Sequence, residues 1–224
     1  MLIYLLLKKI PRNRFRVLTT QLFRRKNHVI FTFIILLLLV SCVLFSQSQL
    51  LSYKVMRNGD EAGWVKLNKN INGNTSIISM ASEVKVRVVF QFTVISNEYT
   101  ESKDQHLVHA YVFRKVNGNV KADIHTRHSG NNYEKESSSK KEKLSFQPAS
   151  FNVLDLYFKE PEGLQQVYSG SHQQNLNIEK KQAGVYKLLL PGGDSNEYYY
   201  KDGICVKVKV DHSLYSVEFV LTQP

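Results

Sequence analysis

The sequence predicts an all-β protein: a large antiparallel, strongly curved sheet, half-barrel or barrel-like, with at most one short helix. Apolar residues recur at every second position in many short runs after residue 50, which is typical of strands with one buried face. Turn dipeptides that favour hairpins separate these runs, as at Asn58-Gly59, Asn117-Gly118 and Asp202-Gly203. Cys205 is the one cysteine after residue 50, so burial of apolar side chains must hold the domain together.

The longest alternating run is Val84–Val94, which is predicted to form one central strand. Its even positions carry valine or phenylalanine, and Lys85, Arg87, Gln91 and Thr93 lie between them. Eleven residues at about 3.3 Å each would extend about 36 Å, beyond the usual strand of about five or six residues. A strand of this length favours a curved sheet closing toward a barrel over the alternative, a sandwich of two sheets.

Shorter strands are predicted before this run. Leu51–Arg57 and Ala62–Asn68 form a hairpin about Asn58-Gly59, and Ser76–Met80 leads toward the long strand. The polar stretch Glu98–Gln105 is predicted to be a turn.

The clearest hairpin joins His106–Val116 to Val120–His128 through Asn117-Gly118. If these two turn residues form the centre of a type I′ turn, Tyr111 lies opposite Ile124. One face of the hairpin is then apolar and comprises Leu107, Tyr111, Phe113, Val120, Ala122 and Ile124. The other face is polar and comprises Arg114, Lys121, Asp123 and Arg127.

The second half of the chain contains one helical candidate among further strands. Residues 131–143 are polar and nearly neutral, which indicates a solvated loop or hairpin tip. Ser150–Phe158 has a capping serine and helical spacing, although a short aromatic strand is the alternative. The remaining strands are predicted at Gln166–Ser169, Leu176–Lys180, Val185–Leu190, Glu197–Tyr200, Ile204–Val210 and Leu214–Leu221. This gives about ten to twelve strands in a single domain.

The positive charge of the chain is concentrated at its N-terminus. Residues 1–46 contain eight basic residues and no acidic one, and so account for +8 of the net charge of +11. The remaining part has no clustered basic excess, which argues against a nucleic-acid partner.

The apolar run Val29–Phe45 follows this basic segment and indicates export. We expect 1–48 to be a basic region plus a secretory signal, cut after Ser46 or Ser48, and 49–224 to be a single β-rich exported domain. The alternatives are an uncut anchor, since 17 residues can barely span a bilayer, and a lipoprotein acylated at Cys42. Membrane contact is then expected through residues 29–45 if they are not removed, or through Cys42 if it carries lipid.

Motifs of catalysis are missing from the sequence. It contains no G-x-S-x-G, no phosphate-binding glycine loop and no H-E-x-x-H. We therefore expect no enzyme and no cofactor. The predicted hairpin makes His109 and His128 diagonal neighbours, about 7–8 Å apart. Two histidines are too few for a zinc site, so no metal is expected, and the pair is only a weak candidate site.

Several blocks of the sequence resemble a known family. They are Leu156–Gly163 with Val167–Ser169, Tyr186–Leu188, Leu190–Gly203 and, more weakly, Tyr53–Val55. Over roughly residues 51–220 the chain is similar to exported proteins of the Bacteroides group of Gram-negative bacteria, grouped as domain of unknown function DUF6134. The resemblance implies a place in the periplasm or on the outer face of the cell envelope, and it implies no catalytic residue. A more distant similarity is to periplasmic lipoprotein carriers, whose curved sheet surrounds an apolar hollow.

These observations together lead us to expect an envelope protein that binds an apolar ligand, such as a lipid, in a cavity lined by the sheet. The alternative is a structural or interaction protein with a packed core, and an enzyme comes third. The expected ligand-lining residues are Val86, Val88, Phe90, Phe92, Tyr111, Phe113, Ile124, Phe151, Leu154, Phe158, Val206 and Val208.

Overall fold

The computed structural model describes residues 47–87, 90–137, 140–213 and 215–223. The apolar run of the predicted export signal and Cys42 lie outside these residues. Within them, a single 14-stranded antiparallel sheet accounts for nearly all regular structure. The prediction of an all-β fold is confirmed, with more strands than the sequence indicated. None of the described residues forms a helix long and apolar enough to cross a membrane.

The strands follow one another through short turns, except where β8 leads to β9. Their bounds are β1 (Gln47–Arg57), β2 (Asp60–Asn72), β3 (Thr75–Arg87), β4 (Gln91–Lys103), β5 (His106–Val116), β6 (Asn119–Ser129), β7 (Asn132–Ser137), β8 (Lys140–Lys143), β9 (Gln166–Ser169), β10 (Gln174–Gln182), β11 (Val185–Leu189), β12 (Ser195–Lys201), β13 (Ile204–His212) and β14 (Tyr215–Gln223). Two short 3-10 turns, η1 (Asp155–Tyr157) and η2 (Pro191–Gly193), lie in the connections.

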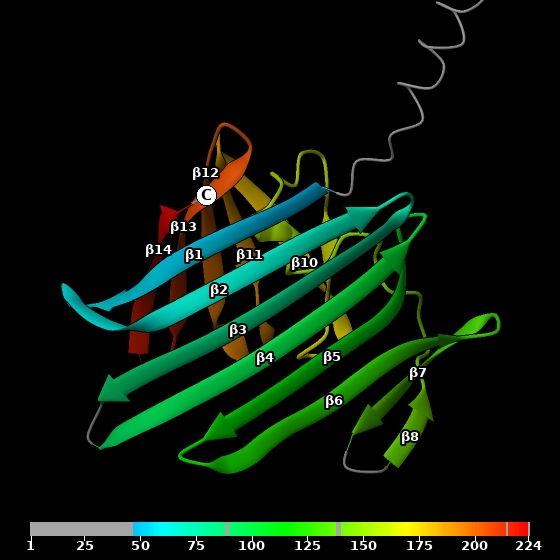
Figure 1. Cartoon of the computed structure of the whole chain (residues 1–224), viewed down its shortest axis with the longest axis horizontal. Coiled ribbons are helices and arrows are strands. Elements are labelled where there is room, and N and C mark those ends of the chain that lie inside the picture. The colour runs from blue at the N-terminus through cyan, green and yellow to red at the C-terminus, as the bar shows by residue number, and fades with distance from the viewer. Residues whose placement is uncertain (1–46, 88–89, 138–139, 214, 224) are drawn as a thin grey trace, which may run out of the picture. The chain divides into compact units, whose positions relative to one another are not determined.

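The sheet is an up-and-down meander that almost closes on itself. Its order is β8-β7-β6-β5-β4-β3-β2-β1-β14-β13-β12-β11-β10-β9, so β1 pairs with β14 in the middle and the two edges are consecutive in the chain. Figure 1 shows β1–β6 as a front layer and β10–β14 as a layer behind it, with strands that cross those of the front. Strand twist bends a long sheet in this way. The prediction of a curved, barrel-like sheet is confirmed, and the sheet remains open between β8 and β9.

The predicted central strand Val84–Val94 is wrong. β3 ends at Arg87 and β4 begins at Gln91, and the two residues pair across the hairpin. Val84 pairs with Val94 in the same ladder, so apolar residues of even number still share one face. A hairpin with an odd number of turn residues preserves the period of two, and alternation alone therefore cannot distinguish it from a straight strand.

The predicted turn Glu98–Gln105 is also shorter than expected. β4 continues through Glu98 to Lys103, and only Asp104 and Gln105 turn, both with positive φ.

A bulge overturns the predicted register of the β5–β6 hairpin. The ladder shifts between Arg114 and Lys115, so Tyr111 pairs with His125 rather than with Ile124. Ile124 pairs instead with Val112, whose side chain is buried. The extra residue is Lys121 of β6, so the bulge exchanges the faces of β6 and leaves those of β5 unchanged. In β5, Arg114 alternates regularly with the buried Val112 and with Val116, which pairs with Val94. Arg114 therefore lies on the inner face of the sheet and not, as predicted, on the polar outer face.

The predicted helix Ser150–Phe158 contains only the single turn η1. The amide oxygen of Asn152 accepts hydrogen bonds from the backbone N–H groups of Leu154 (2.9 Å) and Asp155 (3.2 Å). This side-chain turn competes with a regular helix. Tyr168 of β9 then binds the backbone on both sides of Asn152, which fixes the segment against the sheet.

In the polar stretch 131–143, β7 and β8 pair as a hairpin at one edge of the sheet. Lys135 pairs with Glu142 at 3.2 Å and Lys141 lies 3.8 Å from Glu136. Charged side chains on an edge strand discourage pairing with another chain.

Tyrosines fill the part of the core that surrounds η1. Tyr53 and Tyr198 both lie edge-on to Tyr157, with ring centroids 5.5 and 5.9 Å from it. Cys205 is completely buried here because the β12–β13 ladder shifts between Tyr199 and Tyr200. The shift leaves Val206 without a place on the inner face, so the predicted inward position of Val206 is wrong.

Candidate functional site

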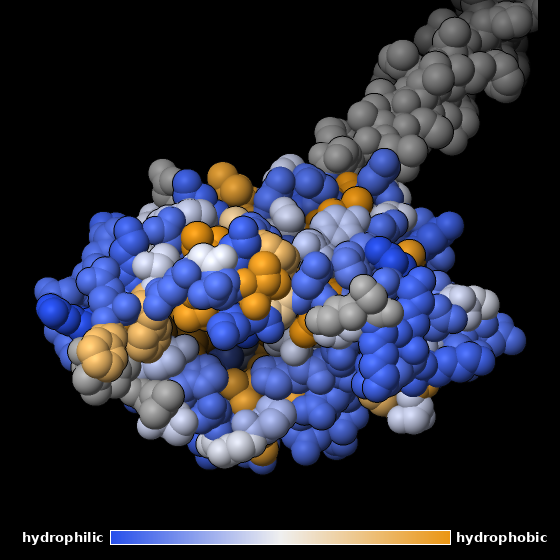
Figure 2. Space-filling model, turned by 90° about the horizontal axis from the view of Figure 1, so that it is seen from below, coloured by the Kyte–Doolittle hydropathy of each residue, from blue (hydrophilic) through white to orange (hydrophobic). Residues whose placement is uncertain are grey.

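A cavity of about 440 Å³ lies between the two layers of the sheet. Its walls come from β2–β5 in front, from β11–β14 behind and from the segment at Asn152–Leu154. Ligand sites in proteins usually enclose about 300–1,000 Å³. Figure 2, which views the domain from the lower edge of Figure 1, shows apolar residues gathered around a hollow in the surface.

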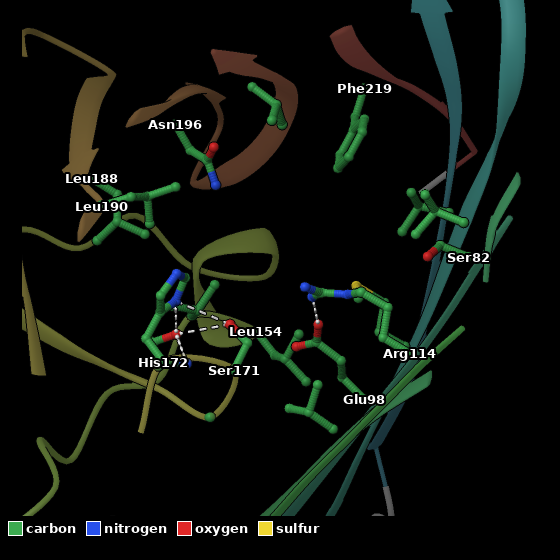
Figure 3. Close-up of a pocket in the computed structure, with 18 of the residues that line it drawn as sticks. Ser82, Glu98, Arg114, Leu154, Ser171, His172, Leu188, Leu190, Asn196 and Phe219 are labelled. Carbon is green, nitrogen blue, oxygen red and sulfur yellow. Dashed lines mark hydrogen bonds and ion pairs between the residues drawn. The ribbon is translucent and has the colours of Figure 1, made fainter. Parts of the chain in front are cut away.

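One wall of the cavity is a continuous apolar patch formed by Val84, Val86, Phe92, Val94 and Val116. Cross-strand pairs join Val86 to Phe92, Val84 to Val94 and Val94 to Val116. Side chains of paired residues lie about 4.5–5.5 Å apart, so the patch is unbroken across β3, β4 and β5. Phe219 of β14 faces it from the other layer (Figure 3).

An ion pair lies next to this apolar patch. Arg114 Nη2 is 3.5 Å from Glu98 Oε1, and the two side chains are 39% and 15% exposed. Burial raises the pKa of the Glu98 carboxyl, and the Arg114 guanidinium opposes that shift. Figure 3 shows both side chains extending from the front layer into the cavity.

The opposite wall carries a histidine in the β9–β10 turn. His172 Nδ1 lies 3.0 Å from Ser169 Oγ and 3.1 Å from Ser171 Oγ. Burial lowers the pKa of His172, and the positive charge of Arg114 lowers it further. The turn reaches the cavity because it contains Gly170, where a Cβ atom would stand 3.3 Å from Val112 Cγ2.

This serine–histidine contact resembles part of a hydrolase site, which also needs a group that orients the histidine. Within the described residues, both hydroxyls contact Nδ1 and no carboxylate binds the ring of His172. The geometry therefore suits hydrogen bonding better than nucleophilic catalysis.

Three polar atoms in the cavity wall have no hydrogen-bond partner within the described part of the chain. They are Thr100 Oγ1, Asn196 Oδ1 and Tyr198 Oη. A buried polar group without a partner is uncommon, and a bound water or ligand usually explains it.

Four of the expected ligand-lining residues border the cavity: Val86, Phe92, Tyr111 and Leu154. Tyr111 does so only partly, because its ring stacks on that of His125 with centroids 4.4 Å apart. Val88 lies outside the described residues.

The other expected residues lie elsewhere. Phe90 is 80% exposed, because it follows the end of β3 instead of continuing a strand. Phe113 alternates with Arg114 and so lies on the outer face, where Lys115 Nζ is 5.4 Å from its ring. Phe158 and Val208 belong to the packed core, and Phe151 packs against it. Ile124 and Val206 are half-buried outside this core. None of these five residues borders the cavity.

Sequence reasoning missed the polar residues of the cavity: Glu98, Arg114, His172 and Asn196. In β5, the regular alternation of Ala110, Val112 and Arg114 indicates that Arg114 could face inward. Tyr111 and Phe113 alternate just as regularly, so the sequence alone does not show which of the two sets faces the interior. The pairing of β5 with β4 decides which set faces inward, because Val116, Arg114 and Val112 lie opposite Val94, Ser96 and Glu98.

The weak candidate pair of histidines does not form. His109 Nε2 lies 3.1 Å from His125 Nδ1, whereas His128 packs on the ring of Tyr133. The shifted register explains this, because His109 pairs with Arg127 instead of Thr126. No group of three or more potential metal ligands occurs in the described ranges.

Comparison with known proteins supports the family resemblance. No curated protein matches the chain. The chain is similar to a solved structure described as a β-barrel-like protein of domain of unknown function DUF1849 from Brucella abortus, with 12% identity and a TM-score of 0.41 over 81% of this chain and 98% of that one. The family model described as domain of unknown function DUF6134 matches residues 53–222. The chain therefore belongs to the DUF6134 family.

Proposed function

We propose that this domain is a non-enzymatic binding protein that holds an apolar ligand, such as a lipid chain, between the two layers of its sheet. The observation that carries the proposal is the cavity of about 440 Å³ with its unbroken apolar patch. Apolar side chains around empty space leave favourable contacts unmade, and a ligand of matching shape would supply them. A packed structural protein would be expected to fill this space with its own side chains.

The test is binding of N-phenyl-1-naphthylamine, an apolar fluorescent dye, by the full chain. We expect a stoichiometry near one dye per chain and displacement by lipid extracted from bacterial envelopes. Phe92→Asp should abolish binding because Phe92 borders the cavity. Gln91→Asp adds the same charge at a neighbouring exposed position and should leave binding unchanged.

Other results would overturn this proposal. If the wild-type chain binds neither dye nor extracted lipid, a structural or interaction protein with no ligand replaces it. Equal loss of binding in both aspartate variants would place the dye outside the cavity.

We also propose that the domain acts in the periplasm or on the outer face of a Gram-negative envelope. Support comes from the basic segment followed by the apolar run Val29–Phe45. Intact-mass measurement of the protein from its native envelope distinguishes the three forms. A chain starting after Ser46 or Ser48 indicates a cut signal, a full-length chain an anchor, and a lipid-bearing Cys42 a lipoprotein. Recovery of the protein with the cytoplasm would exclude export by this segment.

A further inference from the structure

We propose that the cavity ligand is an amphiphile with one anionic headgroup, a carboxylate or a phosphate, that binds the guanidinium of Arg114 opposite His172. This inference rests on the proposed function and adds the chemical class of the ligand. Both sources of the anion share the same chemistry: negatively charged oxygens at the end of an apolar chain.

Arg114 has unused hydrogen-bond donors in the cavity. A guanidinium presents five N–H donors, and within the described part of the chain Arg114 has one partner, Glu98, at 3.5 Å. This distance is long for a charge-assisted hydrogen bond, which is usually about 2.7–2.9 Å. With 39% of its side chain exposed, Arg114 remains accessible to a ligand. A carboxylate or phosphate could therefore bind two of its donors side by side.

His172 offers a further donor across the cavity. Both Ser169 and Ser171 place a hydroxyl within 3.1 Å of its Nδ1. In the neutral ring, a serine hydroxyl that donates to Nδ1 leaves the proton on Nε2. Nε2 then points away from the serines, and in Figure 3 this side of the ring lies near Leu190, another residue of the cavity wall. The cavity thus has donors on two walls.

The balance of donors and acceptors favours an anion over a cation. Glu98 is the acidic side chain among the cavity residues, and it is less exposed than Arg114, at 15% against 39%. A cationic headgroup would have to compete with Arg114 for that carboxylate. The hydroxyls of Thr100 and Tyr198, which lack partners in the described residues, can donate as well. An acceptor-rich headgroup satisfies more of these groups than an ammonium group does.

The position of Arg114 also fits an amphiphile. Arg114 is two residues from Val116 on the same face of β5, a separation of about 7 Å. Val116 begins the apolar patch that continues through Val94 to Phe92. A headgroup at Arg114 would therefore leave its chain on this patch, with Phe219 on the other side.

The experiment compares palmitate with hexadecanol, which has the same chain and an uncharged headgroup. Each displaces the naphthylamine dye from the full-length protein. We expect the wild type to bind palmitate at least about tenfold more tightly, because a charge-assisted contact is worth that much. Arg114→Gln should lose this preference and leave hexadecanol binding within about twofold. The matched control is Lys115→Gln, which removes the same charge from the adjacent residue on the outer face and should change neither affinity.

A second variant separates binding from stability. Arg114→Gln leaves Glu98 without its partner and so weakens the fold by itself. Glu98→Gln instead frees Arg114 from its carboxylate, and we expect palmitate to bind several-fold more tightly while hexadecanol is unaffected. A purely structural ion pair would not shift the two ligands differently.

The failures of the two proposals are distinguishable. If the dye, palmitate and hexadecanol all fail to bind the wild-type protein, the proposed function fails. If both bind equally well and Glu98→Gln changes neither, the cavity is generic and only the headgroup inference is overturned. A third arm with palmitoyl lysophosphatidate identifies the source: tighter binding than palmitate indicates a lipid phosphate, and weaker binding indicates a fatty acid.

Discussion

The packed region around η1 and the cavity region are formed by the same sheet, yet only one of them is filled. In the packed region, Tyr53 Oη donates to the carbonyl of Cys205 at 2.7 Å, and Tyr200 Oη donates to that of Leu156 at the same distance. The front wall of the cavity region carries valines in place of these tyrosines, and the inserted segment borders the cavity at Asn152–Leu154 without filling it. Large side chains with backbone partners close the first region, whereas smaller side chains leave the second region hollow.

The comparison shows how one curved sheet can combine stability with an empty site. The connection from β8 to β9 inserts Leu156, Tyr157 and Phe158, all buried, between the layers at one place only. Burial of these three side chains stabilises the folded protein. The valines near the β3–β4 turn therefore need not be optimally packed.

The largest effect is expected from removing a side chain of the packed region. Leu156 is completely buried, so Leu156→Ala should lower the free energy of unfolding by about 2–5 kcal/mol. Urea denaturation measures this change. Val94→Ala in the cavity wall is the comparison, and it should cost below about 1 kcal/mol because part of that side chain already borders empty space. Equal losses at the two sites would show that the cavity is closed and packed in solution.

Enlarging a side chain should have opposite consequences in the two regions. Val208 has no exposed surface, and Val208→Phe should destabilise the protein by about 1–3 kcal/mol or more. Val94→Phe can extend into the cavity and should keep the free energy of unfolding within about 1 kcal/mol, while it abolishes dye binding. Thermal melts and dye titration check both. A strongly destabilised Val94→Phe variant would argue against free space at this position.

A smaller effect is expected from a single hydroxyl of the packed region. Tyr53→Phe removes the buried hydrogen bond from Tyr53 Oη to the carbonyl of Cys205. We expect a loss of about 1–2 kcal/mol, measured by urea denaturation. Tyr215→Phe, at the cavity, is the control, because none of the hydrogen bonds within the described ranges involves its hydroxyl. A neutral Tyr53→Phe variant would mean that water replaces the hydroxyl.

The smallest effect concerns pH and the cavity region. Burial lowers the pKa of His172 below its usual value of 6.5, so the unfolded chain binds a proton more readily than the folded one. The shifted pKa of His172 contributes fully to the stability of the fold above pH ~6.5. This contribution is lost as the pH falls through the pKa of His172 in the folded state, which is lower than in the unfolded state. The melting temperature should therefore fall between pH 7 and pH 5, and His172→Gln should reduce that slope. An unchanged slope in His172→Gln, with exposed His106→Gln as the control, would show that His172 is hydrated.

Local patterns in the sequence account for the strands and most turns of this protein. Asn58-Gly59, Asn117-Gly118 and Asp202-Gly203 all lie at hairpin turns, because glycine, asparagine and aspartate tolerate positive φ there. The even-numbered face of Val84–Val94 is inward on both sides of the turn, since the described residues Val84, Val86, Phe92 and Val94 all border the cavity. These features depend on neighbours in the chain, and alternation reports them directly.

Which face turns inward beyond a bulge, and whether the interior is filled, depended on the tertiary structure. The shifts at Arg114–Lys115 and Tyr199–Tyr200 each add one residue, and no local pattern marks them. The first places Ile124 opposite Val112, and the second brings Cys205 into the core in place of Val206. The pairing of β5 with β4 places Arg114 rather than Phe113 in the cavity. The hollow itself exists because Leu154–Phe158 covers only one part of the sheet. Register and filling are set by contacts between residues far apart in the chain, and a period of two carries no information about such contacts.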